Sequence, residues 1–218
     1  MAKRIFDIIC SAAALLMLGV PMAIIALAIR LESRGPAIFR QRRAGRRGRP
    51  FTMLKFRTML REVDPYGSSP HSSDDARLTR IGRLLRETSL DELPQLFNVL
   101  VGQMSLVGPR PLYERQAAEW NDRQRRRLDV RPGITGYAQA FGRGGLTIEE
   151  KIELDLHYVD NVSLRLDAKI LARTVANIFT RRGGVYEQQY SRDKEYEAGR
   201  PPGDAPRREE ETDRPHRA

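Results

Sequence analysis

The chain has 218 residues and a formal charge of +10, because 38 lysines and arginines stand against 28 aspartates and glutamates. This length allows one domain of ordinary size, and the positive charge favours anionic partners such as nucleic acid, phosphate substrates or acidic lipid headgroups. The single cysteine, Cys10, excludes an internal disulfide and allows a reducing compartment.

An uncharged apolar segment runs from Ile8 to Ile29. Its 22 residues would span roughly 33 Å as a helix, enough to cross the hydrocarbon core of a bilayer. Pro21 interrupts it, and basic residues flank both ends, which conflicts with a simple crossing because Lys and Arg collect on the cytoplasmic side. We favour a re-entrant helix that enters the membrane, breaks at Pro21 and returns to the same face. A plain transmembrane helix and a signal peptide cleaved after Ala26-Leu27-Ala28 are the alternatives.

The next segments are short and irregular. Residues 34–49 carry seven arginines with little periodicity, which indicates either a solvated loop or a contact with anionic headgroups or a diphosphate. Residues 50–59 alternate loosely and predict a short strand or a half-buried edge. Residues 64–75 are rich in Pro, Gly, Ser and Asp and predict a surface loop.

Further along the chain, apolar residues recur at helical spacing. This pattern predicts helices at Leu78–Leu85, Arg110–Leu128, Ile148–Tyr158 and Leu166–Arg181. The last of these either covers a soluble core or lies flat in a membrane interface. Arg131 to Tyr137 predicts a tight turn that leads into a short strand. Apolar residues nearly vanish after about Glu187, so we expect a disordered tail.

Two adjacent carboxylates, Asp91 and Glu92, allow two interpretations. Ser89-Leu90-Asp91-Glu92 matches a capping box, in which the serine caps a helix and Glu92 reaches back to its backbone. Alternatively, these carboxylates act together with Arg86 and Arg110. The guanidinium groups would clamp phosphate oxygens, one carboxylate would hold Mg²⁺, and the other would attack phosphorus.

At these residues the chain resembles the bacterial sugar transferase family, the monotopic phosphoglycosyl transferases. The resemblance covers nearly everything from Lys3 to about Gly184 and is closest to the minimal, single-domain members of the undecaprenyl-phosphate sugar phosphotransferase type. It rests on a series of linked motifs: Lys3-Arg4-Ile5-Phe6-Asp7, Lys55-Phe56-Arg57-Thr58-Met59, Ser89 to Leu100, Met104 to Pro111, Arg131 to Gly136 and Glu153 to Val159.

The resemblance implies transfer of a sugar-1-phosphate from a UDP-sugar to a polyprenol (undecaprenyl) phosphate, with release of UMP. It implies that Asp91 is the nucleophile that forms a covalent phosphosugar, and that Glu92 is the Mg²⁺ ligand. It also implies that Arg86 and Arg110 contact phosphate. Four further residues occupy motif positions without an assigned role and are candidates for substrate binding: Lys55, Arg57, Arg143 and Asp155.

Two positions depart from the family pattern. Val20-Pro21 stands where members usually have Ser-Pro, so no serine hydroxyl is present to satisfy carbonyl groups freed at the break. Phe141 stands where members often have asparagine, which concerns either sugar choice or local packing.

The fold expected from this resemblance is α+β and mostly helical. It would have a re-entrant membrane helix in residues 1–33, a cytoplasmic catalytic domain with interfacial amphipathic helices and a small β element in residues 34–187, and a charged tail in residues 188–218. The expected location is the bacterial inner membrane, with the active site on its cytoplasmic face and membrane lipids as neighbours. The expected role is the first membrane step of exopolysaccharide, O-antigen, capsule or glycoprotein glycan synthesis.

The competing hypothesis is a membrane-tethered basic module that binds anionic lipid or nucleic acid without catalysis. Nucleic acid is the weaker partner, because no stacking aromatics are interleaved with the arginines between Arg40 and Arg49. We therefore expect no nucleic-acid partner, whereas the sequence allows a homo-oligomer.

Overall fold

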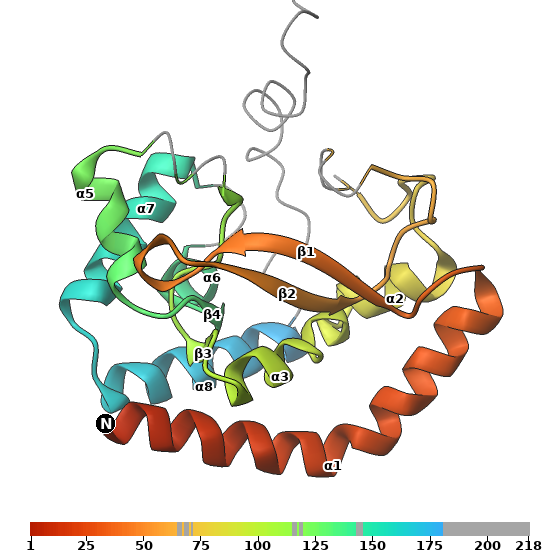
Figure 1. Ribbon diagram of the computed structural model, residues 1–218, viewed down its shortest axis with the longest axis horizontal. Coiled ribbons are helices and arrows are strands. Elements are labelled where there is room, and N and C mark those ends of the chain that lie inside the picture. Colours follow the sequence, from red (N-terminus) through yellow and green to blue (C-terminus); the bar gives the residue numbers. More distant parts are fainter. Residues whose placement is uncertain are drawn as a thin grey trace, which may run out of the picture.

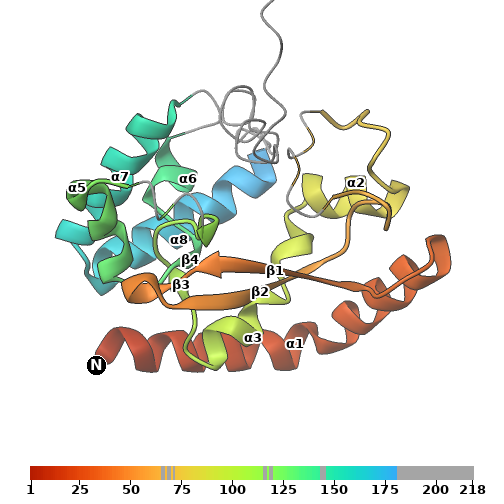
Figure 2. The same ribbon diagram turned by 45° about the horizontal axis from the view of Figure 1, so that its top comes forward.

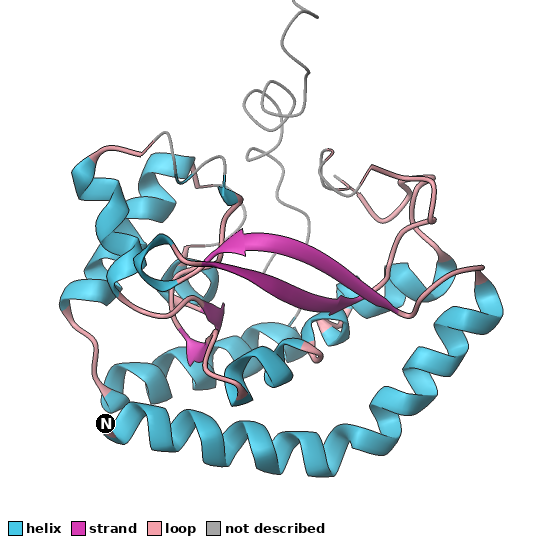
Figure 3. Cartoon of the chain, in the orientation of Figure 1, coloured by secondary structure: helices cyan, strands magenta, loops and turns pink. Residues whose placement is uncertain are grey.

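The computed structural model describes residues 1–180 apart from residues 65, 66, 68, 69, 71, 115, 116, 118, 119 and 143–145. Arg143 and the predicted tail lie outside the described residues. Figure 3 shows a mostly helical chain with two small sheets, as the sequence predicted. Each of the two sheets has two strands.

The N-terminal apolar segment forms a single long helix, α1 (Ala2–Glu32), which bends along one side of the molecule (Figure 1). The helix continues through Pro21, so the expected break is a bend within one helix. A proline removes one hydrogen bond and leaves those on either side, which is sufficient for a kink. Much of α1 is exposed and apolar, with Leu16 86% and Val20 71% exposed. By length and composition, α1 could cross a membrane.

The first turns of α1 are bonded to the rest of the molecule. The buried Asp7 carboxylate accepts hydrogen bonds from Ser105 Oγ at 3.0 Å and from the backbone N–H of Leu106 at 3.1 Å. Lys3 Nζ lies 2.6 Å from Asp167, and Arg4 donates to the backbone carbonyls at the end of α3 (Gln95–Leu100). This end of α1 therefore belongs to the folded core.

The other end of α1 is bonded to the same body. Glu32 accepts hydrogen bonds from the first two backbone N–H groups of α2 (Arg80–Glu87), with its Oε1 2.7 Å from Arg80 N. Ile29 is 1% exposed and packs in one cluster with Phe56 and Leu85. Both ends of the apolar helix are therefore held by one folded unit.

The arginine-rich segment forms a strand, not a loop. β1 (Ile38–Ala44) pairs antiparallel with β2 (Pro50–Phe56) across a short 3-10 turn, η1 (Arg46–Gly48). Figure 2 shows this hairpin lying over α1 and α3. Along β1, Gln41 and Ala44 are buried while Arg40 and Arg42 are exposed, so the strand needs few apolar residues of its own. The buried side chains of Phe51 and other β2 residues supply the core beneath it.

The second sheet joins β3 (Ser105–Val107) in parallel with β4 (Gly133–Thr135). β4 lies within the segment predicted as a tight turn, and a helix begins at Tyr137, where the sequence predicted a strand. The two chains approach closely, because a Cβ on Gly133 would lie 2.1 Å from the backbone nitrogen of Gly108. A side chain at position 133 would therefore separate the strands. Tyr158 completes this region by donating a hydrogen bond to Asp167.

Helices cover this sheet. α6 (Tyr137–Phe141), α7 (Ile148–Asp160) and α8 (Leu164–Thr180) surround it, and the last two confirm the predicted helices. Of the helix predicted at Arg110–Leu128, the described residues contain α5 (Asp122–Arg125) and the start of η3 (Arg126–Asp129). α8 is amphipathic in the way expected: Ile170 is fully buried, whereas Val175 and Ile178 are about half exposed.

Candidate active site

The two carboxylates lie on a 3-10 turn, η2 (Leu90–Glu92), between α2 and α3. Ser89 has a left-handed backbone with φ of 57°, and its side chain makes no capping hydrogen bond. The capping-box interpretation is therefore wrong. Pro94 takes the cap position of α3 instead, and its missing N–H costs nothing there because the first N–H groups of a helix have no intrahelical partner. Without a role in capping, the side chain of Glu92 is available for the cleft.

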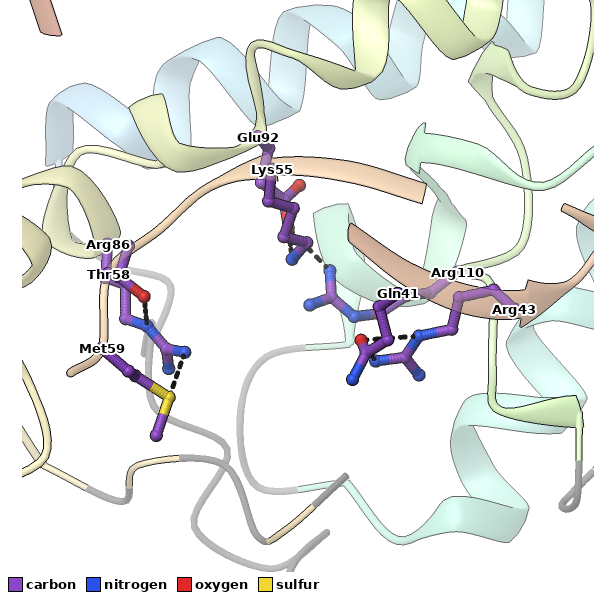
Figure 4. A network of polar contacts seen from close by, with 8 residues as sticks. All are labelled: Gln41, Arg43, Lys55, Thr58, Met59, Arg86, Glu92 and Arg110. Carbon is purple, nitrogen blue, oxygen red and sulfur yellow. Dashed lines mark hydrogen bonds and ion pairs between the residues drawn. The ribbon is translucent and has the colours of Figure 1, made fainter. Parts of the chain in front are cut away.

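Glu92 is held by two cations, as Figure 4 shows. Its Oε1 lies 2.8 Å from Lys55 Nζ and 3.3 Å from a terminal nitrogen of Arg110. Burial would raise the pKa of Glu92, but the positive charges and hydrogen bonds of Lys55 and Arg110 outweigh it and lower the pKa to about 2. Glu92 therefore stays ionised at any pH at which the protein works.

Asp91 behaves differently although it is the adjacent residue. Only 8% of it is exposed, and burial raises the pKa of Asp91. The charge of Lys55 opposes that rise, Glu92 adds to it, and Arg86 and Arg110 oppose it. Within the described part of the chain, its carboxylate accepts no hydrogen bond from another group, so its oxygens are available for reaction.

Arg86 approaches the same region from α2. Its Nε donates to Thr58 Oγ1 at 2.9 Å and a terminal nitrogen lies 3.7 Å from Met59 Sδ (Figure 4). This position depends on Gly82, because a Cβ there would lie 2.0 Å from the carbonyl oxygen of Thr58. The glycine lets α2 lie directly against the chain that follows β2.

A large open cleft of about 1770 Å³ joins these groups. Lys55, Arg86, Asp91, Glu92 and Arg110, all predicted from the sequence, line it together. An anion entering this cleft would meet three cations and a reactive carboxylate. Such a site suits phosphate chemistry, because a developing negative charge would be offset by fixed positive groups.

The cleft also contains residues that the sequence analysis did not single out. Gln41 and Arg43 extend from β1 beside Arg110, and the Arg43 guanidinium lies 3.6 Å from the centre of the Tyr113 ring. Arg127 lines the cleft further along. The period-2 placement of Gln41 and Arg43 was the available signal, but it was hidden by the exposed arginines around them.

Two predicted residues lie away from the carboxylates. The Arg57 guanidinium donates to the carbonyl oxygens of Ser33, Arg34 and Pro36 at 2.9, 3.0 and 2.9 Å, which ties β2 to the segment after α1. Asp155 is buried on α7 in an ion pair with Arg127. Burial raises the pKa of Asp155, and the charge of Arg127 opposes the rise.

Asp91 and Glu92 would need further oxygen ligands from outside the protein to hold Mg²⁺. No group of three or more metal-binding side chains lies together among the residues that the structure describes. Protein-bound Mg²⁺ often uses only one or two carboxylates and takes its other oxygens from water and substrate phosphate. An ionised Glu92 beside a carboxylate with available oxygens fits that pattern, provided that a phosphate substrate is present.

Comparison with known proteins identifies the family of the chain. The family model for the bacterial sugar transferase matches residues 1–181. An uncharacterized sugar transferase, EpsL, of Bacillus subtilis is 46% identical over 83% of this chain and 89% of its own. A UDP-glucose:undecaprenyl-phosphate glucose-1-phosphate transferase of Caulobacter vibrioides is 45% identical over 82% of this chain and 70% of its own. The exopolysaccharide production protein PSS of Rhizobium leguminosarum is 41% identical over 84% and 97% of the two chains.

The matched segment contains α1, both carboxylates and the arginines of the cleft. Identity above 40% over most of both chains leaves no doubt about common descent. The chain belongs to the bacterial sugar transferase family.

Proposed function

We propose that this protein is a phosphoglycosyl transferase that moves a sugar-1-phosphate from a UDP-sugar to a polyprenol (undecaprenyl) phosphate and releases UMP. The observation that carries the proposal is the convergence of one buried carboxylate, one ionised carboxylate and three cations on a single cleft. The activity for which the Caulobacter relative is named supports the substrate classes.

In this proposal Asp91 is the nucleophile. A carboxylate oxygen of Asp91 attacks the phosphorus that carries the sugar, and the bond from that phosphorus to the UMP oxygen breaks with its electron pair leaving on UMP. A polyprenol phosphate oxygen then attacks the same phosphorus. The bond to Asp91 breaks, which restores the carboxylate and yields the lipid-linked sugar diphosphate.

The other charged groups bind and orient the donor. Arg110 and Lys55 hold Glu92 and also present positive charge to the diphosphate, and Arg86 does so from the opposite wall. Glu92 would hold Mg²⁺ through its ionised carboxylate, with Asp91 beside it. When bound, the cation would offset negative charge on the phosphate oxygens.

We also propose a monotopic placement at the inner membrane, with the active site at the cytoplasmic face. The support is that Asp7 and Glu32, near opposite ends of α1, bond to one folded unit. A helix held in this way cannot place its ends on opposite sides of a bilayer without carrying that unit across. In this placement the exposed apolar face around Leu16 and Val20 enters the lipid and both ends return to the same side.

The biological setting is proposed more broadly. A sugar diphosphate on a polyprenol carrier is the starting point for longer glycans, so we assign the protein to the first membrane step of exopolysaccharide, O-antigen, capsule or glycoprotein glycan synthesis. The exopolysaccharide name of the Rhizobium relative supports the first of these.

The decisive experiment measures UMP release with polyprenol phosphate across a panel of UDP-sugars, with and without Mg²⁺. The wild-type protein should release UMP with at least one donor and should lose that activity when the metal is chelated. Asp91→Asn should lose at least about a thousandfold in kcat, since the amide cannot form the acyl phosphate that carries the sugar. Digestion of wild-type protein incubated with donor alone should yield a phosphosugar on the peptide that contains Asp91.

The matched control is Asp129→Asn, the same change at an exposed carboxylate outside the cleft. It should keep wild-type activity. Substantial turnover by Asp91→Asn would refute the nucleophile. No UMP release by wild type with any donor would refute the transferase and favour the membrane-tethered binding module, whose salt-sensitive binding would not depend on Asp91.

A further inference from the structure

A second group of polar side chains lies in the part of the cleft between α6, α7 and α8, beyond Arg110. In the described structure, several of their buried atoms have no hydrogen-bond partner: the side-chain amide nitrogen and oxygen of Gln139, Oδ1 of Asp155, and Nε and one terminal nitrogen of Arg127. All three residues line the same cleft. Leaving a buried donor or acceptor unpaired is costly, and natural proteins do so rarely. Several such atoms in one place indicate a ligand that supplies the missing bonds.

The chemistry of the group points to a ligand that carries hydroxyl groups. Arg127 and Asp155 form an ion pair, so their charges offset each other, Gln139 is neutral, and the positive charge of Lys151 acts on Asp155 from the same helix. The unpaired atoms include both donors and acceptors. Hydroxyl groups both donate and accept, and they match such a mixed set better than a phosphate, which only accepts.

The position of the group relates it to the phosphate end of the cleft. Arg127 donates to the backbone carbonyl of Arg110 at 3.4 Å, so the same guanidinium touches Asp155 and the backbone of a phosphate-binding candidate. Arg110 and Arg127 are therefore neighbours, and both line the cleft. Among the described residues of this end, the cleft walls contributed by Ala138, Ile152 and Thr174 are aliphatic or small.

Among the described residues, the aromatic side chains that line the cleft come from β1, β2 and the segment after Arg110, and not from α6, α7 or α8: Phe39, Phe56 and Tyr113. Tyr113 stands beside Gln41 and Arg43, and a flat nucleobase is more readily held on such a ring than on aliphatic walls. Resting on the proposed function, we infer that Gln139, Asp155 and Arg127 form the subsite for the sugar ring of the UDP-sugar and help to set which sugar is accepted. This assigns a specificity role to α6 and α7, and it gives Asp155 a function that differs from contact with phosphate.

Gln139→Leu tests the subsite most cleanly. It removes both unpaired amide atoms at nearly constant volume, and it should not destabilise the fold because no protein hydrogen bond is lost. Changes at Asp155 or Arg127 would break a buried ion pair and are less informative. We expect KM for the preferred UDP-sugar to rise about tenfold, corresponding to one or two lost hydrogen bonds. Discrimination between UDP-sugars that differ at one hydroxyl should fall, while inhibition by UMP, which lacks the sugar, stays unchanged.

The matched control is Gln103→Leu, the same change at an exposed glutamine outside the cleft. It should leave both KM and sugar preference as in wild type. A parallel loss of UMP inhibition in Gln139→Leu would place the nucleotide here and overturn the inference. Unchanged KM and unchanged discrimination would overturn it as well.

The proposed function is tested separately, by UMP release from the wild-type protein. If wild type turns over and Gln139→Leu behaves as wild type, only the subsite is wrong. If wild type releases no UMP, calorimetric binding of UDP-sugars and UMP to both proteins still decides the subsite. Equal affinity of the two proteins for every UDP-sugar would overturn it in that case too.

Discussion

Asp91 and Glu92 are neighbours in sequence, yet their environments move their pKa values in opposite directions. Burial dominates at Asp91, whereas Lys55 and Arg110 dominate at Glu92. Two carboxylates separated in this way can take different roles, one permanently charged and one responsive to pH. Lys55 is the residue that connects them, because it bonds Glu92 and its charge lowers the pKa of Asp91.

We predict that Lys55→Met shifts the acidic limb of the pH profile of kcat/KM to higher pH. In the proposed mechanism Asp91 attacks in its ionised form, and loss of the Lys55 charge removes an influence that lowers its pKa. At a given acidic pH, less of the carboxylate would then be ionised and the rate would be lower. Measurement of kcat/KM from acidic to neutral pH in wild type and Lys55→Met checks this. Lys55→Arg keeps the charge and should keep the limb near its wild-type position.

An acidic limb at the same pH in wild type and Lys55→Met would show that titration of Asp91 does not govern the rate. A shift in both Lys55 variants would assign the effect to the shape of the lysine and not to its charge.

At the residue scale, the sequence predicted the candidate site well where residue type alone indicates the chemistry. It misled where the outcome depends on backbone geometry. Asp91, Glu92, Arg86 and Arg110 were identified because carboxylates and arginines lay close together in the chain. The capping box was wrong because it is a local pattern, and the left-handed Ser89 cannot be read from residue type alone. Contacts such as that of Arg127 with Asp155 join residues distant in the chain, so no spacing rule could reveal them.

Among the elements, β2 and α1 depend on each other through Arg57. One guanidinium satisfies three carbonyl oxygens just after α1 ends, and it is only 6% exposed. A lysine ammonium at the same position could not span all three with the fixed fork of a guanidinium. Arg57 therefore stabilises the segment that follows α1, although it also lines the cleft.

We predict that Arg57→Lys lowers the free energy of unfolding by about 2–3 kcal/mol, because at least one buried carbonyl is left unpaired. Denaturant unfolding of the detergent-solubilised protein measures this change. The KM for the UDP-sugar of the folded variant should stay near the wild-type value. Arg165→Lys, at an exposed position outside the cleft, is the control and should alter neither quantity.

A normal unfolding curve together with a raised KM in Arg57→Lys would reverse this assignment and make Arg57 a substrate contact, as its motif position first suggested.

Regular elements were predictable in proportion to their apolar periodicity. α2, α7, α8 and β2 were found, whereas β1 was not, because only Gln41 and Ala44 of that strand are buried and several of the others are arginines. The long apolar segment was identified as a helix, but its bend without a break depends on contacts at both ends that the sequence does not display.

For the whole molecule, the arrangement of α1 predicts which sides of the membrane its ends occupy. In a Cys10→Ala background, Ala2→Cys and Arg49→Cys each introduce one thiol at an exposed position on either side of the apolar segment. A membrane-impermeant maleimide should modify both thiols in inside-out vesicles and neither in intact spheroplasts. The reason is that Asp7 and Glu32 bind one folded unit, so both ends share its side.

Modification of the two thiols from opposite sides would restore the plain transmembrane helix. It would also require the contacts of Asp7 or of Glu32 to be broken in the membrane.

The attachment of α1 has a practical consequence for work on the enzyme. Ile29 packs with Phe56 and Leu85. Asp7 accepts hydrogen bonds from Ser105 and Leu106 of β3, the strand that leads to Arg110. A truncated version beginning after residue 33 would expose those apolar side chains and leave the two donors without their acceptor. α1 is thus part of the folded unit, and a fragment that keeps the cleft intact cannot be made by simple truncation.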